Sequence, residues 1–298
     1  MLAAAAGSLI LCGSIHAQAL RFPKRCGEHV VAKRHRPVFL DSVTFPGVSF
    51  PLETSRSRLV ALLRKRAKPG GPQWLPRVWH TVRSAWTNDG YFQAVVDVKT
   101  QAVSSSATAR HFSLRISVDP GPQYRVGVVR VLDANPGQKL AFSHQRLRDL
   151  MPIHPGQILD AGKVSEGLRA IRHFYATNGY IKAAAVSGFH IDTALDRVSF
   201  FVLLDQGKQY RVGRLQILGL DPNLKPLLTS KLSPGAIFNW GEVVNFYRRE
   251  KLLLLPGLSP SDDQIYPNPK THKVDVVLDF RACPESSKHN SPSDVGFE

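Results

Sequence analysis

A stretch of twelve residues occurs twice in this 298-residue chain, and this internal repeat is the feature that most constrains its fold. Residues 121–132 read GPQYRVGVVRVL and residues 207–218 read GKQYRVGRLQIL, so the offset is 207 − 121 = 86. A period of this length is that of a small domain rather than of a single helix or strand pair. The sequence therefore predicts an array of small domains instead of one large core.

Other motifs extend the repeat in the same order. Residues 155–164 (PGQILDAGKV) align without gaps with residues 234–243 (PGAIFNWGEV). A third copy lies upstream, because DGY at residues 89–91 matches NGY at residues 178–180. We expect three units, at residues 37–120, 121–206 and 207–283.

Apolar residues that alternate with polar ones predict the strands of each unit. The first unit is expected to contain a hairpin of residues 92–99 and 112–118, and the second a hairpin of residues 183–191 and 198–204. Residues 274–280 repeat the last strand in the third unit. In the opening strands the alternation changes phase at Gly127 and Gly213, which predicts a bulge at each glycine.

Helical spacing predicts one long helix per unit, preceded by a shorter one. In the second unit the apolar stripe is formed by Val164, Leu168, Ile171 and Tyr175, with Asp160 placed to cap the helix. In the third unit Asn239 is placed to cap the corresponding helix, with Glu242 three residues later. The predicted order is strand, helix, helix, strand, strand. The expected fold class is therefore α+β, with two helices on one face of a three-stranded mixed sheet in each unit.

The N-terminal region indicates export. Residues 1–19 are uncharged and end in Ala-Gln-Ala, which is typical of a signal peptide cleaved after Ala19, and a retained anchor is the alternative. Residues 20–36 form a basic arm, and residues 284–298 a polar tail that we expect to be disordered. The candidate contacts to an anionic surface are Lys24, Arg25, Lys33, Arg34 and Arg36.

Basic residues exceed acidic ones by 39 − 23 = 16 charges. Such an excess suits either solvated segments or attraction to lipid head groups and other anionic surfaces, which would allow peripheral membrane association. No RNA-binding signature is present, and nucleic acid is not an expected partner. Cys26 and Cys283 could form a disulfide, remain free thiols or bond to another chain.

Catalytic motifs are absent from the sequence. The histidines and cysteines lack metal-binding spacing, and neither a Gly-x-Ser-x-Gly elbow nor a phosphate-binding glycine loop occurs. We therefore expect a protein that is not an enzyme, with no catalytic residue, metal site or cofactor.

The ordered motifs together resemble the POTRA (polypeptide-transport-associated) domain, over residues 37–283. In that family, tandem domains project into the periplasm from outer-membrane assembly factors and secretion transporters. There they bind unfolded barrel precursors and accessory proteins, by adding a strand to a sheet edge (β-augmentation). The resemblance implies a periplasmic or outer-membrane-associated module that assists outer-membrane protein assembly, insertion or transport. Its implied partners are an outer-membrane barrel protein or the assembly machinery, and unfolded barrel precursors.

Carried onto this chain, the resemblance places candidate binding edges in the strands predicted at residues 92–99 and 183–191. The candidate residues are Phe92, Ala94, Val96, Val98, Ala183, Ala185, Ser187, Phe189 and Ile191. Only the polar tail follows Cys283, so any membrane barrel is expected to belong to a separate partner. The alternative function is a cell-envelope scaffold, associated with division or the cell wall, that recruits partners and is tethered by its basic arm.

Overall fold

The computed structural model describes residues 38–50, 56–66, 74–105, 110–135, 137, 139–254 and 265–281. The predicted signal peptide, basic arm and polar tail lie outside the described residues, as do Cys26 and Cys283. The described residues up to Tyr210 form one compact body, and those from Arg211 onwards form another.

The chain repeats one order of elements three times. The first repeat contains β1 (Val38–Thr44), α2 (Arg56–Arg66), α3 (Trp74–Thr87), β2 (Val95–Ser105) and β3 (Arg110–Asp119). The second contains β4 (Arg125–Asp133), α4 (His144–Arg148), α5 (Ala161–Thr177), β5 (Ala184–Asp192) and β6 (Arg197–Asp205). The third contains β7 (Arg211–Leu218), α6 (Lys225–Thr229), α7 (Trp240–Arg249), β8 (Ile265–Asn268) and β9 (Lys273–Asp279). The predicted order is confirmed in every repeat.

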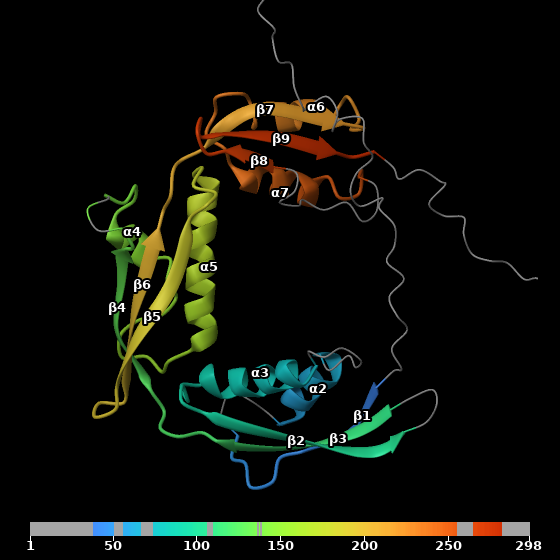
Figure 1. Ribbon diagram of the computed structural model, residues 1–298, viewed down its shortest axis with the longest axis vertical. Helices are drawn as coiled ribbons and strands as arrows, with labels where there is room; N and C mark the ends of the chain where they lie inside the picture. The colour runs from blue at the N-terminus through green and yellow to red at the C-terminus, as the bar shows by residue number, and fades with distance from the viewer. Residues whose placement is uncertain are drawn as a thin grey trace, which may run out of the picture. The chain divides into compact units, whose positions relative to one another are not determined.

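Each repeat has its own three-stranded sheet, in which the last strand lies in the middle. The strand orders are β1-β3-β2, β4-β6-β5 and β7-β9-β8. The first and last strands of each repeat pair in parallel, and the last two pair antiparallel. In Figure 1 the long helices α3, α5 and α7 each lie along one face of their sheet. The expected α+β class with mixed sheets is confirmed.

Apolar side chains fill the space between helices and sheet. The core of the first repeat includes Leu63, Trp86 and Ile116, and that of the second includes Tyr124 and Tyr175. The two clusters of buried residues share no member. The helix caps are those predicted: Asp160 Oδ1 accepts from the Lys163 backbone N–H at 3.1 Å, and Asn239 Oδ1 from that of Gly241 at 2.9 Å.

The bulges at Gly127 and Gly213 are also confirmed. The register of β4 shifts between Val126 and Val129, and that of β7 between Val212 and Leu215. In both strands a side chain of the central strand accepts the N–H that follows the glycine. These pairs are Ser199 Oγ with Val128 N at 3.0 Å and Asp275 Oδ1 with Arg214 N at 2.7 Å. A Cβ at either glycine would collide with that same acceptor, so a larger residue would have to displace the side chain that bonds the bulge.

Tyr175 gives the second repeat a titratable group within its core. Burial, together with nearby Tyr180 and Asp133, raises the pKa of the Tyr175 phenol from 10.0 to about 12. Between these two pH values the unfolded chain releases this proton and the folded chain does not, so the free energy of unfolding falls as the pH rises. Below pH 10 both states hold the proton and the group adds no pH dependence.

We therefore expect Tyr175→Phe to lose less stability than the wild type when the pH is raised from 8 to 11. Urea denaturation of both proteins at the two pH values measures the difference. Parallel losses in the two proteins would show that Tyr175 does not carry the effect.

Candidate protein-binding edges

The two strands predicted as binding edges lie at the outside of their sheets. β2 pairs only with β3, and β5 only with β6, among the strands that the structure describes. Each strand begins later than predicted: β2 starts at Val95 instead of Phe92, and β5 at Ala184 instead of Ala183. Phe92 lies in a turn, Ala94 directly precedes β2, and Phe92 and Ala183 pack against the core of the second repeat.

The candidate binding residues occupy every second position of their strands, on the side of the sheet that faces the helices. Ala94, Val96 and Ala185 are buried, and Val98 and Ile191 are partly buried. Ser187 and Phe189 are exposed. The opposite phase, which the sequence reasoning did not select, places Val186 of β5 in solvent with 62 % of its surface exposed.

Phe92 belongs to a junction between the first and second repeats. Its ring meets that of Phe189 edge to face, with centroids 5.0 Å apart, and that of Phe200 at 6.4 Å. Edge-to-face pairs at such separations are favourable contacts. Phe189 therefore has one side of its ring against the first repeat, although it lies on an outer strand.

Hydrogen bonds that the second repeat donates to one short segment, residues 88–93, complete this junction. Tyr124 donates twice to it, from its backbone N–H to Gly90 O at 2.8 Å and from its hydroxyl to Gln93 Oε1 at 2.9 Å. Gln123 Nε2 donates to Asp89 O at 2.8 Å. In addition, the Gly162 N–H in the first turn of α5 donates to Asn88 Oδ1 at 2.9 Å. The first repeat thus helps to cap the long helix of the second.

The same bonds recur one period later. Tyr210 N donates to Gly179 O at 2.8 Å, and Gln209 Nε2 donates to Asn178 O at 3.0 Å. The Asp/Asn-Gly-Tyr and Gln-Tyr motifs therefore contact each other. The sequence showed both motifs as repeated but gave no sign that they meet, because they lie about thirty residues apart.

The edge opposite β5 is partly closed by a loop. Residues 155–158 of the Pro-Gly-Gln-Ile motif run beside the start of β4, where Arg125 and Ile158 form an antiparallel bridge. The Gly156 N–H donates to Val126 O at 2.8 Å, and Val126 N donates to Gln157 O at 2.8 Å. Arg211 and Ile237 form the equivalent bridge in the third repeat. This loop leaves β5 as the edge of the second sheet that no described segment pairs with.

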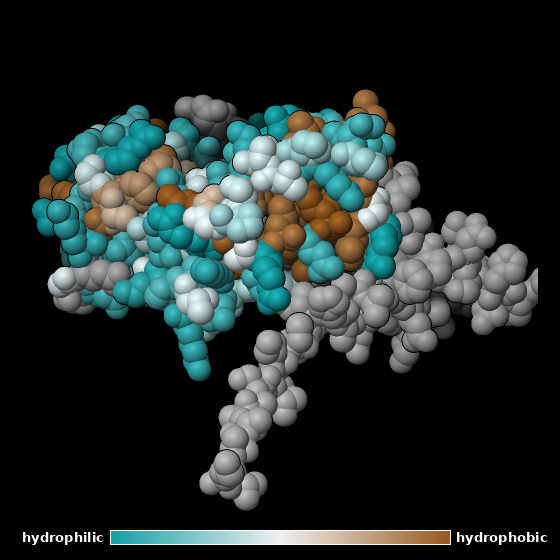
Figure 2. Space-filling model, turned by 90° about the horizontal axis from the view of Figure 1, so that it is seen from above, coloured by the Kyte–Doolittle hydropathy of each residue, from teal (hydrophilic) through white to brown (hydrophobic). Residues whose placement is uncertain are grey.

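The uncovered face of the second sheet carries a row of apolar side chains that reaches this edge. The registers place Val186 beside Leu203 and Leu203 beside Leu132, one residue on each strand. All three are exposed, by 62 %, 41 % and 39 %. On the face of the molecule that Figure 2 shows, brown hydrophobic areas lie among hydrophilic side chains.

The first sheet differs at the matching positions. Val95 at the start of β2 pairs with Asp119, and Ala184 at the start of β5 pairs with Asp205. Two residues further along each strand, Asp97 on β2 is therefore the counterpart of Val186 on β5. Asp97 pairs with Ser117, and Lys99 with Arg115, so the row that corresponds to Val186 is polar, although Val95 next to it on β2 is exposed. An apolar edge row is therefore present in the second repeat and missing from the first.

No group of three or more His, Cys, Asp or Glu side chains is arranged to hold a metal ion within the described ranges. None of the helices that the structure describes combines the length and the apolar character needed to cross a membrane. The candidate anionic-surface residues of the basic arm lie outside the described part, so those predictions stay predictions.

Comparisons with known proteins agree with the fold. Residues 136–207 match the family model of POTRA, described as a surface antigen variable number repeat. A curated protein of Treponema pallidum (strain Nichols), "Putative outer membrane protein assembly factor", is 25 % identical over 220 residues. That match covers 72 % of this chain, and the chain spans 25 % of the relative's length.

A solved structure matches across most of the chain. The crystal structure of BamA POTRA3-5 from Haemophilus influenzae aligns with a TM-score of 0.60 and 20 % identity, covering 85 % of this chain and all of that one. At this identity the likeness concerns the fold alone. Residues 136–207 thus match the POTRA family model, and the chain repeats the fold of tandem POTRA domains in three consecutive units.

Proposed function

We propose that this chain is a periplasmic protein-binding module that assists the assembly, insertion or transport of outer-membrane proteins. The proposal extends to this chain the role that the name of the Treponema relative states for that protein. On this proposal its partners are an outer-membrane barrel protein or assembly machinery and unfolded barrel precursors, and it performs no catalysis.

We further propose that binding uses β-augmentation at β5. The observation that carries this choice is the row Val186, Leu203 and Leu132, which ends at the open edge. An extended segment beside β5 would gain main-chain hydrogen bonds and would place its own apolar residue next to Val186. The polar row at Asp97 and Ser117 makes β2 a weaker site for an apolar client strand.

Photo-crosslinking tests this assignment. A benzoylphenylalanine introduced at Val186 is expected to crosslink barrel proteins or their assembly factors in the native cell envelope. The same group at Asp97, the register-matched control, should capture several-fold less. Mass spectrometry identifies the captured proteins. Equal capture at both positions would contradict the choice of β5, and division or cell-wall proteins at Val186 would favour the scaffold function.

Proline separates strand addition from simple contact with the sheet face. Neighbouring residues on an edge strand direct their N–H groups alternately inwards and outwards. Of Val186→Pro and Ser187→Pro, one should therefore remove an N–H bonded to β6 and lower stability, while the other removes an outward N–H. The variant that keeps its urea midpoint is expected to lose client binding. Retained binding in that variant would contradict β-augmentation at β5.

A further inference from the structure

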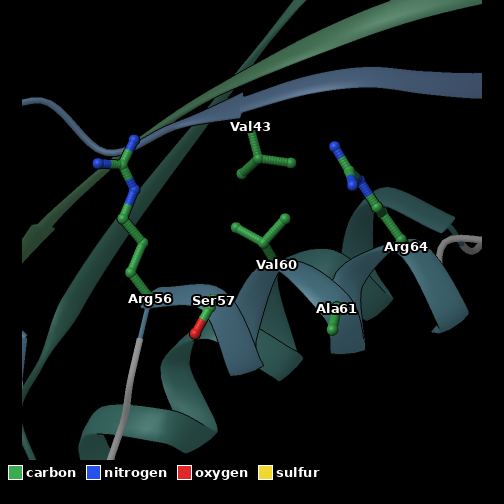
Figure 3. Close-up of a pocket in the computed structure, with 6 residues that line it drawn as sticks. All are labelled: Val43, Arg56, Ser57, Val60, Ala61 and Arg64. Carbon is green, nitrogen blue, oxygen red and sulfur yellow. The ribbon is translucent and has the colours of Figure 1, made fainter.

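A pocket in the third repeat differs from the groove of the first repeat in what its side chains can bind. Figure 3 shows the groove, which lies between β1 and α2, with Val43 and Val60 facing each other across its middle. The pocket of the third repeat encloses about 330 Å³, near the lower end of the ~300–1,000 Å³ that small-molecule sites occupy. Its polar side chains are those of Arg214, Asn268, Thr271, Lys273 and Asp275.

The turn between β8 and β9, which lies at this pocket, has the same backbone frame as the turn between β5 and β6. Asn268 Oδ1 accepts from the backbone N–H groups two and three residues further on, at 2.9 and 3.2 Å. Asp192 Oδ1 accepts from the corresponding two groups in the second repeat, at 3.1 Å each. Near the end of the turns, His272 and Asp196 have φ of 51° and 48°. The two turns therefore differ in their side chains and not in their backbone.

This common frame carries opposite charge in the two repeats. Residues 192–197 contain two aspartates and one arginine, a formal charge of 1 − 2 = −1. Residues 268–273 contain two lysines and no acidic residue, a formal charge of +2 with histidine neutral. Asn268 occupies the position of Asp192, so the third repeat keeps the bonds of the turn without its negative charge.

The turn presents hydrogen-bond donors to the pocket. Because Asn268 Oδ1 accepts from two backbone N–H groups, the Nδ2 amine is the part of this side chain that a ligand can use. Thr271 adds a hydroxyl and Lys273 an ammonium group. Lys273 is exposed and makes no ion pair with any residue that the structure describes.

The carboxylate of the described lining, that of Asp275, is already engaged by Arg214. Asp275 Oδ1 accepts from the Arg214 backbone N–H at 2.7 Å, and Oδ2 lies 3.3 Å from Nε and 3.2 Å from Nη2. This pairing holds the guanidinium at the pocket and leaves Nη1 as a donor within the described structure. The pocket therefore offers donors and positive charge, while its acceptor is occupied.

We propose that this pocket binds a phosphate ester. A phosphate group is negatively charged, and its oxygens accept from several donors at once, which matches two cations, a hydroxyl and an amide N–H. A carboxylate has only two oxygens and would use fewer of these donors. A neutral sugar would need acceptors as well as donors. The site goes beyond the function proposed above, because it lies in another repeat and involves no added strand.

The phosphate ester could be a soluble metabolite or the head group of a lipid, and two measurements on the full chain separate these sources. Isothermal titration calorimetry with glycerol 1-phosphate tests the soluble ligand. Flotation with phosphatidylcholine vesicles that contain phosphatidic acid tests the lipid, whose head group is also a phosphate monoester. Glycerol, which lacks the phosphate, should not bind.

Asn268→Asp is the variant that addresses the pocket most directly. It introduces the residue that the second repeat carries in the same frame, so the turn should keep its bonds. The added carboxylate repels the phosphate and should raise the dissociation constant about tenfold or more. The reciprocal change Asp192→Asn in the second repeat should leave binding intact, and circular dichroism checks that both variants are folded.

A second pair of variants separates this pocket from the general positive charge of the chain. Lys273 pairs with Arg211 as Arg197 pairs with Arg125, so Lys273 and Arg197 occupy matching positions. Lys273→Gln and Arg197→Gln remove one positive charge each. Only Lys273→Gln is expected to weaken binding, by several-fold.

Each outcome assigns or removes the site. Calorimetric binding that Asn268→Asp abolishes would assign a soluble phosphate ester, and vesicle binding that it abolishes would assign a lipid head group. The proposal would be overturned if neither ligand bound, if Asn268→Asp bound like the wild type, or if Lys273→Gln and Arg197→Gln lost binding equally. Because crosslinking at Val186 does not involve this pocket, failure of either proposal leaves the other standing.

Discussion

Replacing Gly90 with alanine is expected to destabilise the first two repeats by about 2–4 kcal/mol, because it combines backbone strain with a clash at their junction. Gly90 has φ of +91°, a conformation that residues with a side chain rarely adopt. A Cβ there would lie 2.8 Å from Ile158 Cγ2, 2.9 Å from Gln123 Cγ and 3.1 Å from Tyr124 O. All three atoms belong to the second repeat, so relief requires the Ile158 and Gln123 side chains to rotate and the Tyr124 carbonyl to move away from Gly90.

Urea denaturation measures the loss of stability, and limited proteolysis of the connection near residues 119–123 measures the loosening. Gly156→Ala is the matched control. Gly156 has a similar φ of +85° but no atom within 4 Å of its Cβ position, so only the strain of about 1–2 kcal/mol should appear. Equal losses and equal cleavage in the two variants would show that the contacts of Gly90 do not hold the repeats together.

Trp86→Ala should have a still larger effect, a loss of about 3–5 kcal/mol from the first repeat. The indole of Trp86 is fully buried, and its ring centroid lies 5.5 Å from that of Phe50. Since the first and second cores share no buried residue, the damage should remain in the first repeat. Thermal unfolding is then expected to show an early transition that is absent from the wild type.

Intrinsic fluorescence makes this transition visible. The second repeat contains no tryptophan, whereas Trp74, Trp79 and Trp86 lie in the first and Trp240 in the third. Hydrogen exchange at β4–β6 should stay slow in Trp86→Ala while exchange at β1–β3 accelerates. Trp79→Ala, which removes a half-buried indole bonded to Val96 O at 3.0 Å, should cost less. Simultaneous acceleration in both sheets would mean that the two repeats unfold as one unit.

The local features of this fold were predictable because they depend on residues close together in the sequence. Asp160 and Asn239 cap the helices as expected, and the phase changes at Gly127 and Gly213 are bulges. Strand starts were less accurate. The apolar alternation continues upstream through Phe92, but that side chain is apolar because it packs against the second repeat.

The candidate sites were harder to predict because they depend on registers and on contacts between elements. The sequence showed Val186 as one apolar residue among others, and only its pairing with Leu203, and that of Leu203 with Leu132, makes a row. Similarly, only the structure shows that Val43 of β1 and one face of α2 line a common groove in the first repeat. The alternation of apolar and polar residues selected side chains that face the core. When both faces of a strand carry apolar residues, this alternation does not show which face is buried.

The bonds from Tyr124 to Gly90 and from Tyr210 to Gly179 have a consequence for how such a chain lengthens in evolution. The second repeat carries both partners of such a pair, since it begins with the donor Tyr124 and contains the acceptor Gly179, whereas the first repeat supplies only an acceptor and the third only a donor. A duplicate of the second repeat would therefore bring both partners with it, and no new surface would be needed when the copy number changes. Unequal recombination between copies can add or remove a domain while each remaining joint keeps its geometry.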